Sequence, residues 1–188
     1  MLRYALTKDP PACVKRRQAL GGSAGKGEVS LISKLMSGKS GAVSVRAAAG
    51  LSLQRMAGRE GGGDAAMLLA SGVPAACRAV LSDSVAPADV RVSASKIVAS
   101  LSNFGGTWLS SAAHKNPDWQ DAVHAMAVLA SESKEDAVLR TSALSGLSAI
   151  LASPCGQSLS PAAATAAVEG LSSILSQDAS SSSSASLK

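Results

Sequence analysis

Apolar residues recur along the chain with the spacing of one buried helical face. The pattern i, i+3, i+6, i+7 occurs in three full copies between residues 29 and 130 and again between residues 168 and 175. The copies are Val29, Ile32, Leu35 and Met36; Pro74, Cys77, Val80 and Leu81; Val123, Met126, Leu129 and Ala130; and Val168, Leu171, Ile174 and Leu175. Because this spacing puts all four members on one side of an α-helix, it predicts four equivalent helices.

A series of arginines keeps the same register. Ten residues after the last member of each full copy, a basic residue follows an apolar one and precedes a stretch of small residues: Arg46, Arg91 and Arg140. The arginines are 45 and 49 residues apart, a period typical of helical repeat arrays. Two series in register predict an all-α fold.

Cap residues and breakers indicate where helices begin and end. Asp118 is expected to cap a helix that begins at Trp119, and Ser160 is a cap followed by proline at the first helical position. Aromatic residues make up 2% of the chain, so the core must consist mainly of aliphatic side chains on closely packed helices. We expect Trp119 to fill a seam between repeats.

Residues 64–104 resemble a repeat of the armadillo family, with HEAT repeats as the nearest alternative. Asp64–Gly72 resembles the short first helix with its closing glycine, Val73–Leu81 the second helix, and Val90–Phe104 the long third. The resemblance extends over residues 28–176. It implies an armadillo-like right-handed helical solenoid of about three and a half repeats, whose third helices line a concave binding face.

Charge and composition divide the chain into three segments. Residues 1–27 carry six Lys or Arg against Asp9, whereas residues 28–188 carry 12 basic and 12 acidic residues. We interpret 1–27 as a basic flexible arm or targeting segment, with its glycines at 21–27 as linker, and 28–176 as the repeat domain. The serine-rich segment 177–188 is expected to be disordered.

Three isolated cysteines indicate an intracellular protein, and mitochondrion and cytoplasm both stay open. No apolar stretch is long enough for a membrane span.

Candidate chemistry is sparse. Gly21–Gly25 matches the G-x-S-x-G pattern around Ser23, but the preceding basic residues do not form the buried strand that this chemistry needs. His114 and His124 are ten residues apart and fall on different expected elements. Cys77 lies in the apolar register and is expected to be buried. We therefore expect no catalytic residue, no metal site and no cofactor.

The resemblance also bears on partners. Importin-type members hold basic peptides with repeated Trp and Asn. The matching Trp positions here are Leu51, Lys96 and Ser145, and the matching Asn positions are Arg55, Ser100 and Ala149. Basic side chains at Arg55 and Lys96 would repel a basic peptide, so an acidic or mixed segment fits better. The partner-binding candidates are Arg55, Lys96 and the arm residues Lys15, Arg16 and Arg17.

Arg46, Arg91 and Arg140 have two interpretations. They could line a groove, but we favour a structural ladder in which each bonds a loop carboxylate or a helix end between adjacent repeats. The sequence therefore predicts a non-catalytic protein–protein interaction module, a scaffold or accessory subunit of a larger assembly. The alternative is an RNA-associated repeat protein tethered by the basic arm, since the neutral body is a poor nucleic-acid surface.

Overall fold

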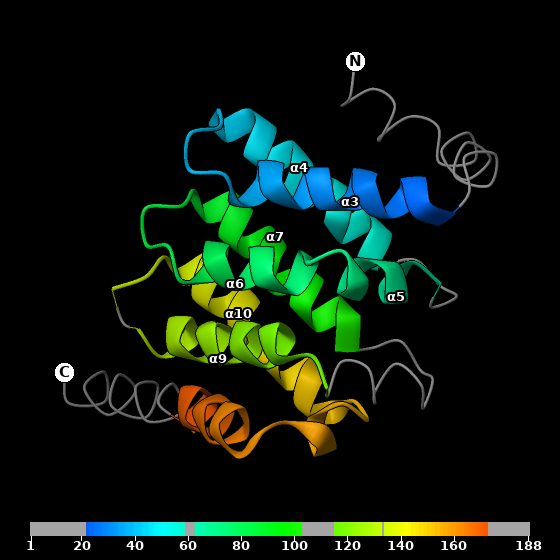
Figure 1. Ribbon diagram of the computed structural model, residues 1–188. Helices are drawn as coiled ribbons and strands as arrows, with labels where there is room; N and C mark the ends of the chain where they lie inside the picture. The colour runs from blue at the N-terminus through cyan, green and yellow to red at the C-terminus, as the bar shows by residue number, and fades with distance from the viewer. Residues whose placement is uncertain (1–21, 59–62, 103–114, 133, 173–188) are drawn as a thin grey trace, which may run out of the picture.

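The computed structural model describes residues 22–58, 63–102, 115–132 and 134–172, and every regular element within them is a helix (Figure 1). The all-α prediction is therefore confirmed. The elements are α3 (Gly22–Ser37), α4 (Val43–Ala57), α5 (Gly63–Ala70), α6 (Val73–Leu81), α7 (Ala88–Ser102), α9 (Pro117–Ser131), α10 (Ala137–Ala152), the 3-10 helix η1 (Gly156–Ser158) and a helical segment over residues 161–172.

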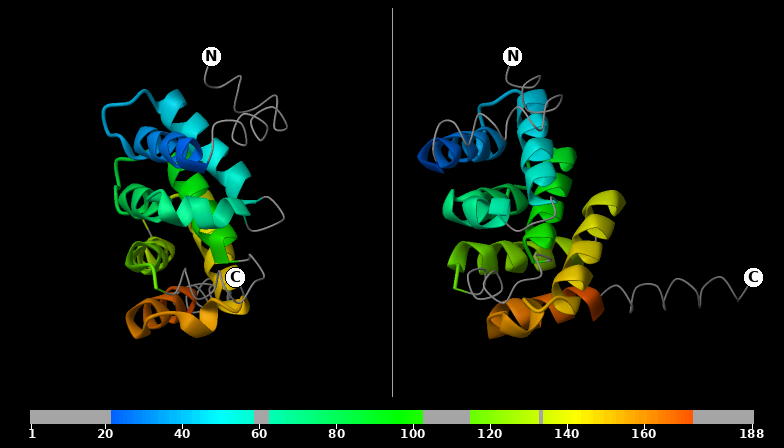
Figure 2. Two further views of the ribbon diagram at one scale, coloured as in Figure 1. Left: turned by 45° about the vertical axis from the view of Figure 1, so that its right-hand side comes forward. Right: turned by 90° about the vertical axis from the view of Figure 1, so that its right-hand side faces the viewer.

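The long helices form two layers, which the right-hand view of Figure 2 separates clearly. One layer contains α3, α6 and α9 in order, with α6 packed against both of the others. The second layer contains α4, α7 and α10, with α7 in the middle. Each helix of the first layer also packs on the helix that follows it in the second, which gives the pairs α3–α4, α6–α7 and α9–α10.

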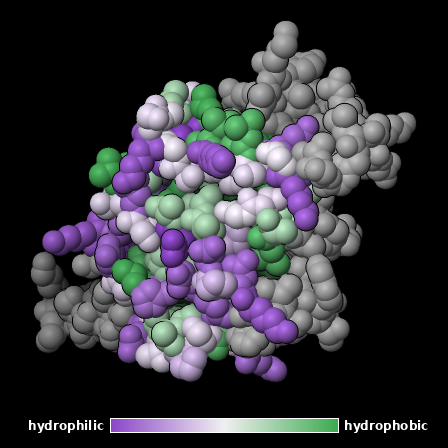
Figure 3. All heavy atoms as spheres, viewed as in Figure 1, coloured by the Kyte–Doolittle hydropathy of each residue, from purple (hydrophilic) through white to green (hydrophobic). Residues whose placement is uncertain are grey.

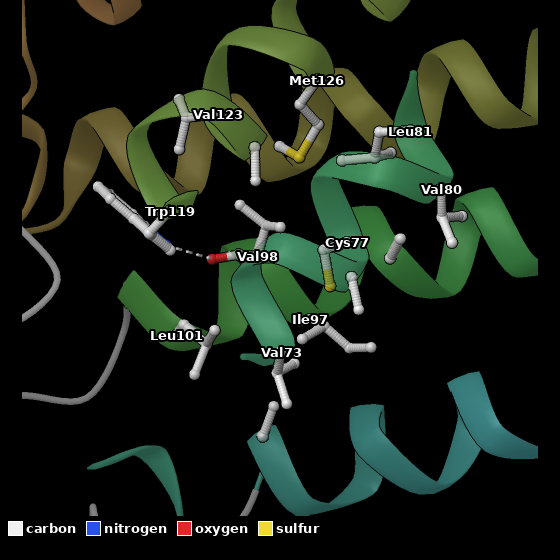
Figure 4. Close-up of a cluster of buried hydrophobic side chains, with 14 of the residues drawn as sticks. Val73, Cys77, Val80, Leu81, Ile97, Val98, Leu101, Trp119, Val123 and Met126 are labelled. Atoms are coloured by element: carbon white, nitrogen blue, oxygen red, sulfur yellow. Dashed lines mark hydrogen bonds between the residues drawn. The ribbon is translucent and has the colours of Figure 1, made fainter. Parts of the chain in front are cut away.

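The core lies between the two layers, and the residues that the apolar register selects on α3, α6 and α9 form one side of it, opposite buried side chains of α4, α7 and α10. Ile32, Cys77 and Met126 occupy corresponding positions in α3, α6 and α9, and all three are buried in one continuous cluster. Figure 4 shows the part of this cluster formed by α6, α7 and α9. Leu35 is the member of the three full copies that is only half buried.

Trp119 fills the space between α9 and α7. Its indole is fully buried, and its Nε1 donates a hydrogen bond to the main-chain carbonyl of Val98 at 3.4 Å (Figure 4). A buried indole needs such an acceptor for its N–H. The residue thus links two successive helix pairs, as expected of a seam.

The junction between α5 and α6 follows the expected boundaries. Helix α5 ends at Ala70 and α6 begins at Val73, with Gly72 between them at φ 75°. This left-handed conformation favours glycine because it has no Cβ. The expected first and second helices of residues 64–81 are therefore both present.

Helix α3 begins earlier than the sequence indicates. The glycine-rich residues 22–27, assigned above to the arm and its linker, form the first turns of this helix. Gly25 is buried one turn before Val29 on the same helical face. Packing on this face outweighs the low helix propensity of glycine.

The cap of α9 also differs from the prediction. Asn116 rather than Asp118 caps the helix, and its Oδ1 accepts a hydrogen bond from the Trp119 amide at 3.1 Å. Pro117 then occupies the first helical position, which proline favours. Ser160 caps the last helical segment as expected, because its Oγ accepts from the Ala163 amide at 3.2 Å.

The fourth copy of the apolar register is wrong at Val168, while its members Ile174 and Leu175 lie outside the described residues. Val168 is 58% exposed, whereas Ala163 and Ala167 are buried. A Cβ at Gly170 would lie 3.0 Å from the carbonyl oxygen of Ala127 in α9. Small residues let this last helix approach α9 closely, and the large apolar residues that define the register therefore do not mark the buried face.

Candidate functional site

An open groove of about 720 Å³ runs across the α4/α7/α10 layer. Gln54 of α4 lies at one side, the middle of α7 forms the floor, and α10 contributes the other side. Beside the groove, α10 and α7 present small residues to each other. A Cβ at Gly146 of α10 would lie 3.4 Å from the Cβ of Ala99 in α7.

The groove is lined by small and uncharged side chains with one cation. Lys96 is exposed and is the charged residue among those that line it. The hydrogen-bonding side chains are Gln54, Ser100, Thr141, Ser142 and Ser145, and apolar surface comes from Val92, Val138 and alanines. The Oγ of Ser142 is buried and has no hydrogen-bond partner within the described chain. The surface therefore offers many hydrogen-bonding groups and a positive charge.

Charge is distributed unequally between the two layers. Helices α3, α6 and α9 carry three basic and three acidic residues. Helices α4, α7 and α10 carry five basic residues against Asp89, namely Arg46, Arg55, Arg91, Lys96 and Arg140. On the α3/α6/α9 face, hydrophilic and hydrophobic residues are interspersed (Figure 3). Of the five basic residues on α4, α7 and α10, Arg55 and Lys96 are exposed, so the helices of the groove layer present these two cations to solvent.

The expected partner-binding residues fall in three places. Lys96 lines the groove, while Arg55 is exposed on α4 and is not among the lining residues. Lys15, Arg16 and Arg17 lie outside the described residues. Six positions were compared with the repeated Trp and Asn of importin-type proteins. Four of them line the groove, namely Lys96, Ser100, Ser145 and Ala149.

The three arginines in register make the same hydrogen bond. The guanidinium of each donates to the main-chain carbonyl oxygen ten residues earlier, at the end of the preceding helix. Arg46 bonds Met36 at 3.1 Å, Arg91 bonds Leu81 at 3.4 Å, and Arg140 bonds Ala130 at 3.4 Å. These bonds join the two helices of one pair. The last carbonyls of a helix have no partner within it, and an arginine side chain can donate to them.

A second cleft, of about 380 Å³, is formed by α6, α9 and the loops that follow them. Four of the charged residues around it form two ion pairs. Arg78 bonds Asp121 at 2.8 Å, and Arg91 holds Glu135 through two bonds at 2.7 and 2.8 Å. Glu135 does not follow from the arginine register, because the corresponding position five residues before Arg91 is Ala86.

The residues considered for catalysis belong to different segments of the chain. Ser23 belongs to α3, His124 is exposed on α9, and His114 lies outside the described residues. Burial raises the pKa of the Cys77 thiol to about 12, which keeps it protonated and unreactive. Burial also raises the pKa of Cys155.

Among the described residues, no group of three or more His, Cys, Asp or Glu is arranged to hold a metal ion. None of the described helices combines the length and apolar character needed to cross a membrane.

Comparison with known proteins provides no relative. No family model matches the chain, and neither a curated protein nor a solved structure matches it. The inference of function therefore depends on the groove and its chemistry.

Proposed function

We propose that this chain is a non-catalytic protein–protein interaction module that binds an acidic or mixed segment of a partner protein across α4, α7 and α10. The observation that carries this proposal is the groove, which has Lys96 on its surface and no carboxylate among its lining residues.

The finer fold belongs to the same proposal. We infer an armadillo-like right-handed solenoid of about three and a half repeats. It is supported by the period of the buried register, by the stacking of three helix pairs, and by the short helix α5 before α6. In such an array the α4/α7/α10 layer corresponds to the third helices and therefore to the face used for binding.

The lining of the groove suits a peptide segment. Small side chains such as Ser100 and Ser145 let a peptide main chain approach the helices closely. Hydroxyl groups and the amide of Gln54 can bond peptide N–H and C=O groups, which would otherwise lose hydrogen bonds on leaving water. Lys96 adds a preference for a carboxylate on the bound segment.

The thin core supports a role within a larger assembly. The buried side chains are mainly alanine and medium-sized aliphatic residues, and Gly50 and Gly146 lie inside helices α4 and α10, where glycine weakens a helix. We propose that the protein is a scaffold or accessory subunit that gains stability from its partner. Mitochondrion and cytoplasm are both compatible with this role.

The test uses labelled peptides of equal length that are acidic, neutral or basic, with binding to the full-length protein measured by fluorescence anisotropy. We expect the acidic peptide to bind most tightly. Lys96→Glu should weaken this binding about tenfold. The matched control is Lys34→Glu, which makes the same charge change at an exposed position on α3.

A second variant tests the groove without changing charge. Ser145 is exposed on α10 and lines the groove, so Ser145→Trp should block the peptide while leaving the fold intact. Equal binding of all three peptides, or equal effects of the Lys96 and Lys34 variants, would contradict the proposal. Arg55→Glu tests whether the bound segment extends beyond the groove toward α4.

A further inference from the structure

The loops that lead into α7 and α10 can be compared position by position. In both cases the arginine in register, near the start of the helix, comes ten positions after the last buried residue of the preceding helix, Leu81 or Ala130. In the loop before α10, Glu135 holds the guanidinium of Arg91 from the preceding helix pair. The next residue, Asp136, caps α10 by accepting from the amides of Val138 and Leu139.

The loop before α7 has neither carboxylate at these positions. The residue that corresponds to Glu135 is Ala86, and the residue that corresponds to Asp136 is Pro87. The arginine of the preceding helix pair is Arg46. Its position relative to Ala86 corresponds to the position of Arg91 relative to Glu135. This loop does contain Asp83, whose carboxylate accepts a hydrogen bond from the Val85 amide at 3.1 Å and forms no ion pair with Arg46.

Arg46 is consequently a buried cation that lacks a complete set of partners. The residue is 5% exposed, and its Nε donates to the Met36 carbonyl. Its Nη2 is buried and has no hydrogen-bond partner within the described chain. An arginine stays charged under all ordinary conditions, and a buried charge without a counter-charge lowers the stability of the fold.

We propose that Arg46 is a binding site for a single carboxylate, which would occupy the place that Glu135 takes at Arg91. The carboxylate is that of a free organic acid or of an acidic side chain on a partner protein. This site is separate from the groove, since Arg46 is not among the groove-lining residues. Its test is therefore independent of the proposed function.

The test measures thermal unfolding of the full-length protein in sodium acetate and in sodium chloride of equal ionic strength. Acetate well above its dissociation constant should raise Tm by about 3 °C or more relative to chloride. Ala86→Glu supplies the carboxylate from the chain itself, so it should raise Tm in chloride and remove the acetate response. Arg46→Met should also remove that response and corrects for general effects of acetate on stability.

Glu135→Ala is the matched positive control. It converts the Arg91 site into one that resembles the Arg46 site, so the acetate-dependent rise in Tm should be larger than in the unaltered protein. A response in Glu135→Ala but none in the unaltered protein would overturn the proposal. An acetate response that persists in both Ala86→Glu and Arg46→Met would overturn it as well.

A peptide arm distinguishes the two sources of the carboxylate. The probe is a blocked tripeptide with a central glutamate, and its glutamine counterpart is the control. If the glutamate peptide raises Tm as acetate does, the site accepts an acidic side chain of a protein. If acetate alone acts, the site accepts free organic acids, and if neither acts, the proposal fails.

Discussion

Arg91 and Glu135 form a bidentate ion pair, although they are 44 positions apart in the sequence. Nη1 lies 2.7 Å from Oε2 and Nη2 lies 2.8 Å from Oε1, and the two side chains are only 7% and 15% exposed. Because Arg91 belongs to α7 and Glu135 precedes α10, this pair connects the second helix pair to the third. A parallel, bidentate geometry of this kind is the strongest form of a charged hydrogen bond in proteins.

Removing this carboxylate should be costly. We expect Glu135→Ala to lower the free energy of unfolding by about 3 kcal/mol, because it leaves a buried guanidinium without its counter-charge. Asp121→Ala, which breaks the exposed pair with Arg78, should lower it by less than about 1 kcal/mol. Urea denaturation of both variants measures the difference, and equal losses would show that the burial of the Arg91 pair has no energetic consequence.

The thiol of Cys77 should make the protein sensitive to alkali. Burial raises its pKa from 9.0 to about 12 in the folded state. Between these values the unfolded chain loses the proton and the folded chain keeps it. The contribution to stability is therefore complete below pH 9 and declines above it, by about 1.4 kcal/mol per pH unit. In urea denaturation between pH 9.5 and 10.5, Cys77→Ala should lose stability less steeply than the unaltered protein; equal slopes would contradict the burial.

A substitution at Gly27 tests where α3 begins. A Cβ at this exposed position meets no atom within 4 Å. If residues 22–27 are helical, Gly27→Ala should raise the free energy of unfolding by about 1 kcal/mol, and Gly27→Pro should lower it by about 3 kcal/mol. If these residues were a flexible linker, neither change would move the urea midpoint.

The last helical segment offers a test of its buried face. Ala167 is fully buried and its neighbour Val168 is exposed. Ala167→Asp should lower the free energy of unfolding by about 2 kcal/mol or more, because it places a charge in the contact with α9. Val168→Asp should change it by about 0.5 kcal/mol or less. A larger loss for Val168→Asp than for Ala167→Asp would instead support the buried face that the apolar register predicts.

The basic arm can be tested for RNA binding in the full-length protein. Any affinity for a single-stranded oligouridine should fall when Lys15, Arg16 and Arg17 are all replaced by alanine, and should fall steeply with added salt. Lys96→Glu serves as the groove control and should leave RNA binding unchanged. Binding that survives the arm variant but not the Lys96 variant would indicate that the groove itself binds RNA.

Periodicity predicts the central part of the fold well because the buried faces there consist of large apolar residues. The positions of Ile32, Cys77 and Met126 follow from spacing alone, whereas the boundaries of residues 73–81 come from the resemblance to an armadillo repeat. The same reasoning aligns the three arginines and offers a loop carboxylate or a helix end as the partner of each, without choosing between them. All three bond a carbonyl at a helix end, and Arg91 also bonds the loop carboxylate of Glu135.

The prediction fails where small residues make the contacts. Gly25, Ala167 and Gly170 lie on packed faces, yet apolar periodicity does not select them because they contribute little hydrophobic area. The same holds beside the groove, where Gly146 of α10 and Ala99 of α7 let the two helices approach closely. The resemblance to armadillo repeats points to Lys96 and to three further lining positions, Ser100, Ser145 and Ala149, whereas the groove that they share requires coordinates.

The order of the helix pairs in space follows their order along the chain, and this has a consequence for folding during synthesis. Helices α3 and α4 leave the ribosome before α6 and α7 and can pack on each other before those two helices are synthesised. Each later pair then adds to a surface that is already formed, so few segments have to wait for a distant partner. We expect nascent chains that end after α7 to be partly protected from proteases, with Arg91 still lacking Glu135.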